Sequence, residues 1–548
     1  MSSATRTFDP VELEILWQSL ISTVNEQARA LQRAAFSPIV REAGDLANAV
    51  FDRRGRMVAQ AVTGTPGHIN SLALGAAAML EEYPVDSLVP GDVLITNDPY
   101  KTAGQLLDVT VLVPAWRTPA AGSKPRLIAL FGSTIHHTDV GGYGIGAGGR
   151  DCFEEGLWIP ICKLMAGDGS GGSERNGDVW KFILSNVRQP DHMAGDLHAQ
   201  MASGEVGAQR LATLCDTHGL DDIEDLADEI IERSEAATRA TIRELDAGTH
   251  DASAVLDLAD GSTVDIVCSM TVDPDAGEII VDYEGSSDAS PWGINVVRNY
   301  THAYTTFTVR SVLNPDIPNN HGSLAPIRMR APEGSVVHAV PPQPGTARHV
   351  VGMFLPNALL KALAQVKPDG AMAEGAGAVW TMQINGHHED GSPFITAMFT
   401  YAGGVGARAS KPGLDACSYP TGVSAVPIEV VEASAPVRFL RKALRPGSGG
   451  AGAQPGGLGQ VIEFEVDTAR PWQLNAVTSR LTEPPQGIFG GEPGASGSFQ
   501  VNGEPVTTQT RITLQPGDSV RLELPGGGGY GEPGVPGDGE DRGLLATR

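Results

Sequence analysis

The spacing of hydrophobic residues changes near residue 250, and this change constrains the fold more than any other feature of the sequence. Before it, Leu13, Leu16, Leu20 and Val24 recur every three or four residues, which is typical of an amphipathic helix. After it, segments such as STVDIVCSMTV and EIIVDYEG alternate apolar and polar residues, which is typical of half-buried strands. The sequence therefore predicts an α+β protein in which a mixed region precedes β-rich ones.

A chain of 548 residues exceeds the size at which one hydrophobic core keeps growing, so we expect a multidomain protein. Residues 1–250 are expected to form a mixed helix and strand region that contains a metal site. Residues 251–440 are expected to form a β-rich domain with an inserted helix near 350–366, and residues 441–548 a glycine-rich β region with a loose tail. The stretch PGSGGAGAQPGGLG in this last region is expected to be either a linker or a loop lined by backbone.

Several elements of the first region can be placed by their local signals. Asp9 and Pro10 predict the start of a long helix, and an Arg-Arg-Gly turn at 53–55 predicts a hairpin. The segments GDVLITNDPY and LDVTVLVPAW predict two further strands, and residues 127–134 predict another. This last strand leads directly into His136, so we expect His136 at a strand end.

Charge and cysteine content exclude several classes of protein. The formal net charge of −26 gives an acidic surface that repels phosphate backbones and anionic membranes, so we expect no nucleic-acid or membrane partner. The five cysteines are scattered without a CxxC pair, which predicts neither a disulfide framework nor a thiolate zinc site. No apolar stretch reaches the length of a membrane span. We therefore expect a cytoplasmic protein.

The densest group of side chains that can bind metals or transfer protons lies between residues 97 and 139. It comprises Asn97, Asp98, Gln105, Asp108, His136, His137 and Asp139. Mixed carboxylate, amide and imidazole donors suit Zn, Mn or Fe(II). The alternative is that the two histidines satisfy hydrogen bonds within turns while the aspartates cap loops.

Three features outside this group also have two interpretations. His68 is either a ligand or proton carrier or a hydrogen-bonded loop residue, and the pair Arg348 and His349 either clamps a carboxylate or begins a solvated helix. The glycine runs at 447–459 and 526–529 either present N–H groups to an anion or form tight turns. Neither run continues into the Lys-Ser/Thr of a phosphate-binding loop, so we expect no self-sufficient nucleotide site. Since the chain also lacks a GxSxG elbow, a metal-bound water is the expected nucleophile.

Several motifs, in order along nearly the whole chain, resemble the hydantoinase B family. They are SPIVREAGDLANAVFD, GDVLITNDPY, TAGQLLDVTVLVP, HHTDVGG, NVRQPDHMAGDLHAQMA, PNNHGSLAPI, SGGAG and PGGGGYG. The family comprises B-type subunits of ATP-dependent hydantoin and lactam hydrolases, the matching half of 5-oxoprolinase, and subunits of ketone carboxylases. The resemblance implies a division of labour, in which a separate A-type ATPase subunit phosphorylates the substrate and the B-type subunit completes the reaction at a metal.

The resemblance also implies roles for individual residues. The metal ligands it implies are Asp45, Gln105, Asp108 and His136, and the ion is Zn, Mn or Fe. His137 and Asp139 are implied to be the catalytic, proton-handling groups beside that ion. Gln105 departs from the pattern, because many relatives have His at this position; an amide oxygen binds such ions less tightly than imidazole.

The expected function is that of the B-type subunit of an ATP-dependent amidohydrolase that opens a hydantoin, 5-oxoproline or a related lactam. ATP would bind to the A-type partner, and the two chains would form a hetero-oligomer. Two alternatives stay open at this point. In the first alternative, the chain is a subunit of an ATP-dependent ketone carboxylase. In the second, it is a non-catalytic scaffold that shapes the ATPase subunit, and Gln105 favours this second alternative.

Overall fold

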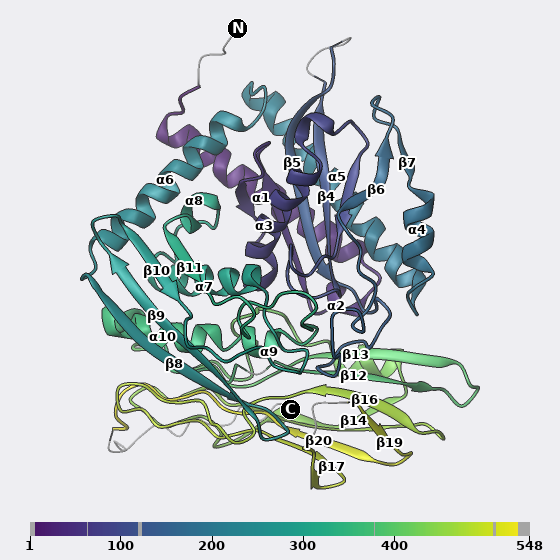
Figure 1. Ribbon diagram of the computed structural model, residues 1–548, viewed down its shortest axis with the longest axis vertical. Coiled ribbons are helices and arrows are strands. Elements are labelled where there is room, and N and C mark those ends of the chain that lie inside the picture. Colours follow the sequence, from purple (N-terminus) through teal and green to yellow (C-terminus); the bar gives the residue numbers. More distant parts are fainter. Residues whose placement is uncertain (1–5, 63, 119–122, 378, 508–510, 535–548) are drawn as a thin grey trace, which may run out of the picture.

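A computed structural model describes residues 6–62, 64–118, 123–377, 379–507 and 511–534. Within these residues the chain forms four β-sheets with helices packed on them, which confirms the α+β class (Figure 1). The N-terminal and middle regions lie side by side above the C-terminal sheets in this view. The predicted loose tail falls on residues 535–548, which lie outside the described residues.

The N-terminal region is built on an antiparallel sheet of seven described strands, in the order β2-β1-β5-β4-β3-β6-β7. The predicted hairpin is present as β1 paired with β2, and the three other predicted strands are β3, β4 and β5. The strands are β1 (Leu46–Phe51), β2 (Met57–Gln60), β3 (Val93–Thr96), β4 (Asp108–Arg117), β5 (Arg126–His136), β6 (Cys162–Gly167) and β7 (Ser173–Arg175).

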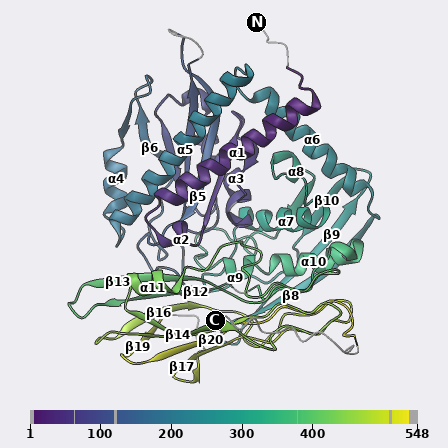
Figure 2. The ribbon, with the colours of Figure 1, turned by 180° about the vertical axis from the view of Figure 1, so that it is seen from behind.

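Helices cover both faces of this sheet. Helix α1 (Pro10–Ala34) and helix α5 (Pro190–His218) cross one face together (Figure 2), and α3 (Pro66–Glu82) packs on the other. The predicted start of α1 is confirmed, because the Asp9 carboxylate accepts the first N–H groups of the helix. The remaining helices of the region are α2 (Pro38–Arg41), α4 (Gly177–Leu184) and α6 (Glu224–Arg243).

The middle region contains a four-stranded sheet in the order β11-β10-β9-β8. Its strands are β8 (Gly248–Asp257), β9 (Thr263–Asp273), β10 (Glu278–Asp282) and β11 (Ile327–Arg330), and its helices are α7 (Arg298–Leu313), α8 (His321–Leu324), α9 (His349–Gly352) and α10 (Leu355–Val366). Helix α7 packs against α3 and so joins the first two regions. The predicted inserted helix is present as α9 and α10. Among the described residues this stretch is apolar and long enough to span a membrane, but 78% of it is buried inside the protein, as in a core helix.

Two further sheets form the C-terminal layer, in the orders β13-β12-β16-β19 and β14-β15-β20-β17-β18. Strand β12 pairs with β16, and the expected boundary at residue 440 falls inside β14. The expected second and third regions therefore share sheets. The elements are β12 (Val379–His387), β13 (Pro393–Ala402), α11 (Ile428–Ser434), β14 (Val437–Leu444), β15 (Gln460–Val466), β16 (Trp472–Val477), β17 (Ser498–Val501), β18 (Glu504–Pro505), β19 (Ile512–Leu514) and β20 (Ser519–Glu523).

Beside these sheets, four glycine-rich segments pack directly against one another. We call residues 403–406, 448–459, 487–494 and 525–531 the glycine-rich bundle. The N–H of Gly457 donates to the Val405 carbonyl at 2.9 Å, and the N–H of Gly527 donates to the Gly457 carbonyl at the same distance. A Cβ on Gly456 would overlap the carbonyl group of Gly527. The glycine runs therefore pack backbone against backbone, and the N–H groups of residues 526–529 donate to backbone carbonyls rather than forming an anion site.

Candidate functional site

Three of the predicted site residues lie together because neighbouring strands begin or end at them. Asp45 immediately precedes β1, Asp108 is the first residue of β4, and His136 is the last residue of β5. The sheet order places β5 between β1 and β4, and Asp108 lies opposite His136 in the antiparallel register. The backbone N–H of His136 also donates to the Asp45 carbonyl at 3.3 Å. One corner of the sheet therefore carries two carboxylates and an imidazole.

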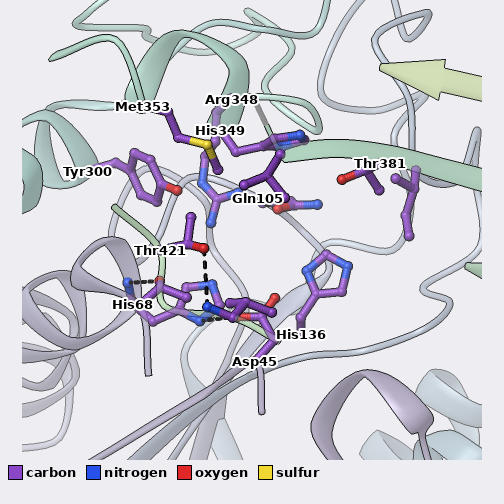
Figure 3. A pocket seen from close by; sticks show the side chains of 14 residues that line it. Asp45, His68, Gln105, His136, Tyr300, Arg348, His349, Met353, Thr381 and Thr421 are labelled. Carbon is purple, nitrogen blue, oxygen red and sulfur yellow. Dashed lines mark hydrogen bonds and ion pairs between the residues drawn. The ribbon is translucent and has the colours of Figure 1, made fainter. Parts of the chain in front are cut away.

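His68 connects the two carboxylates of this corner. His68 lies in the first turn of α3. Its backbone N–H donates to the side chain of Thr65, which caps the helix. Its Nε2 is 3.0 Å from Asp108 Oδ2. Its Nδ1 is 3.3 Å from Asp45 Oδ1, and Figure 3 labels both of these residues. Burial opposes the charged imidazolium, but the carboxylates of Asp108 and Asp45 outweigh burial and raise the pKa of His68. His68 is therefore hydrogen-bonded, as one of the two interpretations predicts, but it lies in a helix rather than a loop and contacts both carboxylates.

Arg348 reaches the same corner from the middle region. It precedes α9, and its guanidinium donates to the side chains of Gln105 and Asp108 and to the carbonyl of Ala103. Its Cζ lies 4.2 Å from the centre of the Tyr300 ring, which faces it as a cation–π partner. Only 2% of Arg348 is exposed, so it does not begin a solvated helix.

The charges on Arg348 and His68 control the protonation of Asp108. Burial by itself would raise the pKa of this fully buried carboxyl group. The guanidinium and the imidazole instead hold the pKa of Asp108 well below its ordinary value. Asp108 is therefore a carboxylate throughout the physiological range, and its Oδ1 lies 3.1 Å from His136 Nδ1. An ionised carboxylate in this position fixes the orientation and the tautomer of the His136 ring.

His68, His136 and Arg348 line a cavity at which all three regions of the chain meet, with about 480 Å³ of space between atoms, including space open to solvent (Figure 3). The N-terminal region contributes the charged cluster, the middle region contributes α7 and α9, and the C-terminal layer contributes β12 and the loop before α11. The lining residues are Asp45, Thr65, His68, Gln105, His136, Ile145, Tyr300, Arg348, His349, Met353, Val379, Thr381, Thr421 and Val423.

Sequence reasoning missed some of these lining residues and one residue behind them. Tyr300, Thr381 and Thr421 carry hydroxyl groups at the cavity but lie far along the chain from the predicted cluster, and no local pattern distinguishes them. Glu155 is buried, and it accepts the N–H groups of the two residues at 345 and 346, at 2.8 and 2.7 Å, just before Arg348. Burial raises the pKa of Glu155 to about 7. Glu155 thus fixes the segment that delivers Arg348.

The structure places the two predicted catalytic residues, His137 and Asp139, away from the cavity lining. His137 immediately follows β5, and its side chain lies against α5, where its Nε2 is 3.4 Å from Gln200 Oε1. Burial lowers the pKa of His137. Asp139 forms an ion pair with Arg188 and accepts the N–H of Gly141 at 3.1 Å, so it holds a loop in place.

Asn97 and Asp98 also have local structural contacts. The Asn97 amide group donates to the Leu106 carbonyl at 2.7 Å and accepts the N–H of Ile159 at 2.6 Å. Asp98 accepts the N–H of Tyr100 at 3.0 Å. These contacts shape the loop that presents Gln105, as the loop-capping alternative predicts for these two residues.

Comparison with known proteins shows which family the chain resembles. The sequence matches the model of the family described as hydantoinase B/oxoprolinase over residues 9–533. The chain belongs to the hydantoinase B/oxoprolinase family. It is 28% identical to the B-type subunit of a putative D-/L-hydantoinase of Pseudomonas sp. (strain NS671) and 30% identical to an uncharacterized protein, MJ0963, of Methanocaldococcus jannaschii; each match covers 96% of this chain and 91% of the relative.

A solved structure supports the same assignment. The fold is similar to that of an ATP-dependent caprolactamase from Pseudomonas jessenii, with a TM-score of 0.86, 25% sequence identity, and coverage of 96% of this chain and 92% of that chain. The predicted resemblance to the hydantoinase B family is thus confirmed, together with the fold class.

For this member of the hydantoinase B/oxoprolinase family, the residues implied to bind a divalent metal do not fit that task as they are arranged. The Gln105 amide oxygen and Asp108 Oδ2 both accept from Arg348, and Asp108 Oδ1 faces His136 Nδ1. The side-chain oxygens of Gln105 and Asp108 that a metal would need are thus occupied by protein donors. In the part of the chain that the structure describes, no group of three or more His, Cys, Asp or Glu side chains is placed to hold a metal ion.

Proposed function

We propose that this chain is the B-type subunit of an ATP-dependent enzyme that opens a cyclic amide, such as a hydantoin, 5-oxoproline or another lactam. In this proposal a separate A-type ATPase subunit phosphorylates the amide oxygen, and the two chains form a hetero-oligomer in the cytoplasm. The observation that carries the proposal is the buried pair of Asp108 and His136 at the cavity. It is supported by the names of the relatives, one a putative hydantoinase and the other a caprolactamase.

In the proposed reaction His136 acts as the general base, in place of His137 or Asp139. Because Asp108 favours a proton on Nδ1, the Nε2 atom of His136 is the one that accepts a proton from water. The hydroxide adds to the carbon that carries the phosphorylated oxygen. His136 returns its proton to the nitrogen, and the C–N bond then breaks while the added hydroxyl group loses its own proton to that nitrogen and becomes a carbonyl. The products of this step are an amine and an acyl phosphate. A second water hydrolyses this to a carboxylate and phosphate.

The other cavity residues hold the substrate and the base in place. Arg348 and His68 keep Asp108 ionised, so that the carboxylate can stabilise the imidazolium that forms on His136. Burial raises the pKa of Tyr300, so its phenol stays protonated and can donate to an oxygen of the substrate. The hydroxyl groups of Thr381 and Thr421 face the same cavity from the C-terminal layer.

The proposal is tested by reconstituting this chain with its A-type ATPase subunit and measuring ring opening and ATP hydrolysis together. Replacing His136 by Gln should lower the rate of ring opening by at least about 100-fold, which is the usual contribution of a general base. The isolated chain should hydrolyse no ATP, with or without a lactam or hydantoin, because its sequence lacks a phosphate-binding loop.

The control variant is His198→Gln, which makes the same substitution on the exposed surface of α5. It should keep the wild-type rate. A His136→Gln complex with unchanged ring opening would remove the cavity from the reaction and favour the non-catalytic scaffold. ATP hydrolysis that depends on bicarbonate and a ketone, with no ring opening, would favour the carboxylase alternative.

A further inference from the structure

We infer that Arg348 is the resident cation of this cavity, and that it supplies at Gln105 and Asp108 the positive charge that the family resemblance implies for a divalent metal ion. The inference rests on the proposed function only for the statement that the cavity is the reaction site. The position of the guanidinium, its charge and the packing that holds it there are properties of the chain itself.

Each nitrogen of the guanidinium has its own partner on the loop that leads into β4. Nε donates to the Ala103 carbonyl, one terminal nitrogen donates to Gln105 Oε1, and the other donates to Asp108 Oδ2. These two side-chain oxygens belong to two of the four residues that the resemblance implies as metal ligands. A guanidinium is protonated at all working pH values, so the charge at this point is permanent.

The surrounding packing is built for this side chain. Gly104 adopts a positive φ of +83°, and a Cβ at this position would lie 2.8 Å from Arg348 Cδ, so only glycine leaves room for the arginine. The Tyr300 ring lies against the guanidinium, with its centre 4.2 Å from Cζ. Glu155 fixes the backbone at 345 and 346 through two hydrogen bonds. Arg348 is therefore held from three sides.

A divalent metal and Arg348 cannot share these oxygens. A metal bound to Gln105 Oε1 and Asp108 Oδ2 would sit about 2.1 Å from each oxygen, which is where the two donor nitrogens of Arg348 approach. The ion would meet a like charge at close range in a buried site, where Coulomb repulsion is weakly screened. Asp108 Oδ1 is also engaged, since it faces His136 Nδ1.

This arrangement explains why glutamine stands at position 105. An amide oxygen is a good acceptor for a guanidinium N–H, and it carries no charge of its own. Histidine at this position would offer a single ring nitrogen as acceptor and is a stronger ligand for Zn. Gln105 and Arg348 thus act together: the amide oxygen of Gln105 accepts from the guanidinium, so replacing either residue removes the hydrogen-bond partner of the other.

The inference is tested by measuring metal binding directly, without reference to activity. The wild-type chain, purified without chelators and then exposed to Zn²⁺, Mn²⁺ or anaerobic Fe²⁺, should retain no more than about 0.1 ion per chain after desalting, by elemental analysis. The double variant Gln105→His/Arg348→Ala should retain about one Zn²⁺ per chain, because it gains an imidazole and loses the competing cation.

A matched variant separates the effect of charge from that of the new imidazole. Gln105→His/Arg348→Lys keeps a cation at the site and should bind Zn²⁺ at least about tenfold more weakly than the double variant with Ala. Circular dichroism and thermal unfolding establish that each variant is folded. The inference is overturned if wild type retains about one ion that Asp108→Asn abolishes, or if a folded Gln105→His/Arg348→Ala chain binds none. The first of these outcomes needs no variant at Arg348, so it decides even if that substitution prevents folding.

An activity measurement distinguishes failure of this inference from failure of the proposed function. Ring opening by the reconstituted wild-type complex should persist in 1,10-phenanthroline, which removes Zn and Fe but leaves the Mg²⁺ that ATP requires. Loss of ring opening under these conditions, with ATP hydrolysis retained, would overturn the resident-cation assignment. A complex that opens no cyclic amide at all would contradict the proposed function, while the metal-binding measurements would still decide the role of Arg348.

Discussion

The cavity and the glycine-rich bundle both bury polar groups, and they satisfy them by opposite means. Around the cavity, ionised side chains neutralise one another: Arg348 and His68 pair with Asp108, which is fully buried. In the bundle many of the contacting residues are glycines, and N–H groups such as that of Gly527 donate to carbonyls of neighbouring segments. Both satisfy the rule that a buried polar group needs a partner.

The difference determines how each region responds to substitution. In the bundle the close approach of backbones defines the fold, and any side chain larger than hydrogen occupies space that another backbone fills. At the cavity, a side chain can be replaced by one of similar shape while the strands that carry it remain, because the sheet is held by its own ladder and core. Substitutions in the bundle should therefore act on folding, and those at the cavity on charge and chemistry.

The largest expected effect is that of Gly456→Ala in the bundle. The added Cβ would overlap the carbonyl of Gly527, and a backbone cannot move aside as a flexible side chain does. We expect a loss of at least about 3 kcal/mol in the free energy of unfolding, measured by denaturant titration. Gly177→Ala is the control, since a Cβ there meets nothing within 4 Å and the residue starts helix α4. Equal stability of the two variants would contradict a backbone-packed bundle.

An effect of comparable size is expected for Arg348→Met at the cavity. The substitution keeps much of the volume but leaves Asp108 as a buried carboxylate without its guanidinium, which costs about 3–5 kcal/mol in comparable pairs. Adding Asp108→Asn should restore part of the lost stability, because the uncompensated charge is then removed. Arg328→Met, at an exposed ion pair with Glu278, should change the unfolding midpoint little. Failure of the second substitution to restore any stability would argue against a charge effect.

The pH dependence of stability provides the next test. Burial raises the pKa of Glu155 to about 7 from 4.5, so the folded state binds the proton more tightly than the unfolded chain. The stability contributed by this group is complete below the unfolded pKa and is lost as the pH rises through about 7. Relative to Glu155→Gln, the wild type should lose roughly 3 kcal/mol between about pH 4.5 and pH 8.

The neighbouring Glu154 is the control for this measurement. It is partly exposed, and its hydrogen bonds with Arg150 lower its pKa to about 2, so both its folded and unfolded pKa values lie at or below the start of the window. Glu154→Gln should therefore leave the slope of stability against pH unchanged over this range. A wild-type slope equal to that of Glu155→Gln would show that Glu155 is not protonated preferentially in the folded chain.

Sequence reasoning predicted the part of the site that depends on neighbouring strands. Asp108 and His136 lie at strand ends that hydrophobic patterns locate, and the resemblance adds Asp45. Arg348 immediately precedes α9, and Tyr300 lies in α7. No local sequence pattern shows which helix of a second region will pack against a given sheet edge. From the sequence, one interpretation of Arg348 is a clamp for a carboxylate. In the structure, the carboxylate that it binds is that of Asp108, which belongs to the protein itself.

The glycine-rich bundle was less predictable, for a different physical reason. Glycine usually marks turns because it tolerates positive φ, so runs of glycine predict loops or linkers. In this chain most of the bundle's glycines serve close approach instead, and that approach requires four segments far apart in sequence to meet. A property that exists only between distant segments leaves no signal in any one of them.

The smallest expected effect is that of replacing His137, the residue next to the proposed base His136. It tests whether the residue just outside the cavity lining takes part in the reaction. His137 immediately follows β5 and does not line the cavity; its Nε2 lies 3.4 Å from Gln200 Oε1. His137→Asn should therefore leave ring opening within about twofold of wild type and cost about 1 kcal/mol of stability through the weakened buried contact. His136→Asn, the matched substitution one residue earlier, should abolish most of the activity while both chains stay folded. If the two variants lose activity equally, then His137 takes part in proton transfer, as the family resemblance implies. The different surroundings of the two side chains would then not give them different roles.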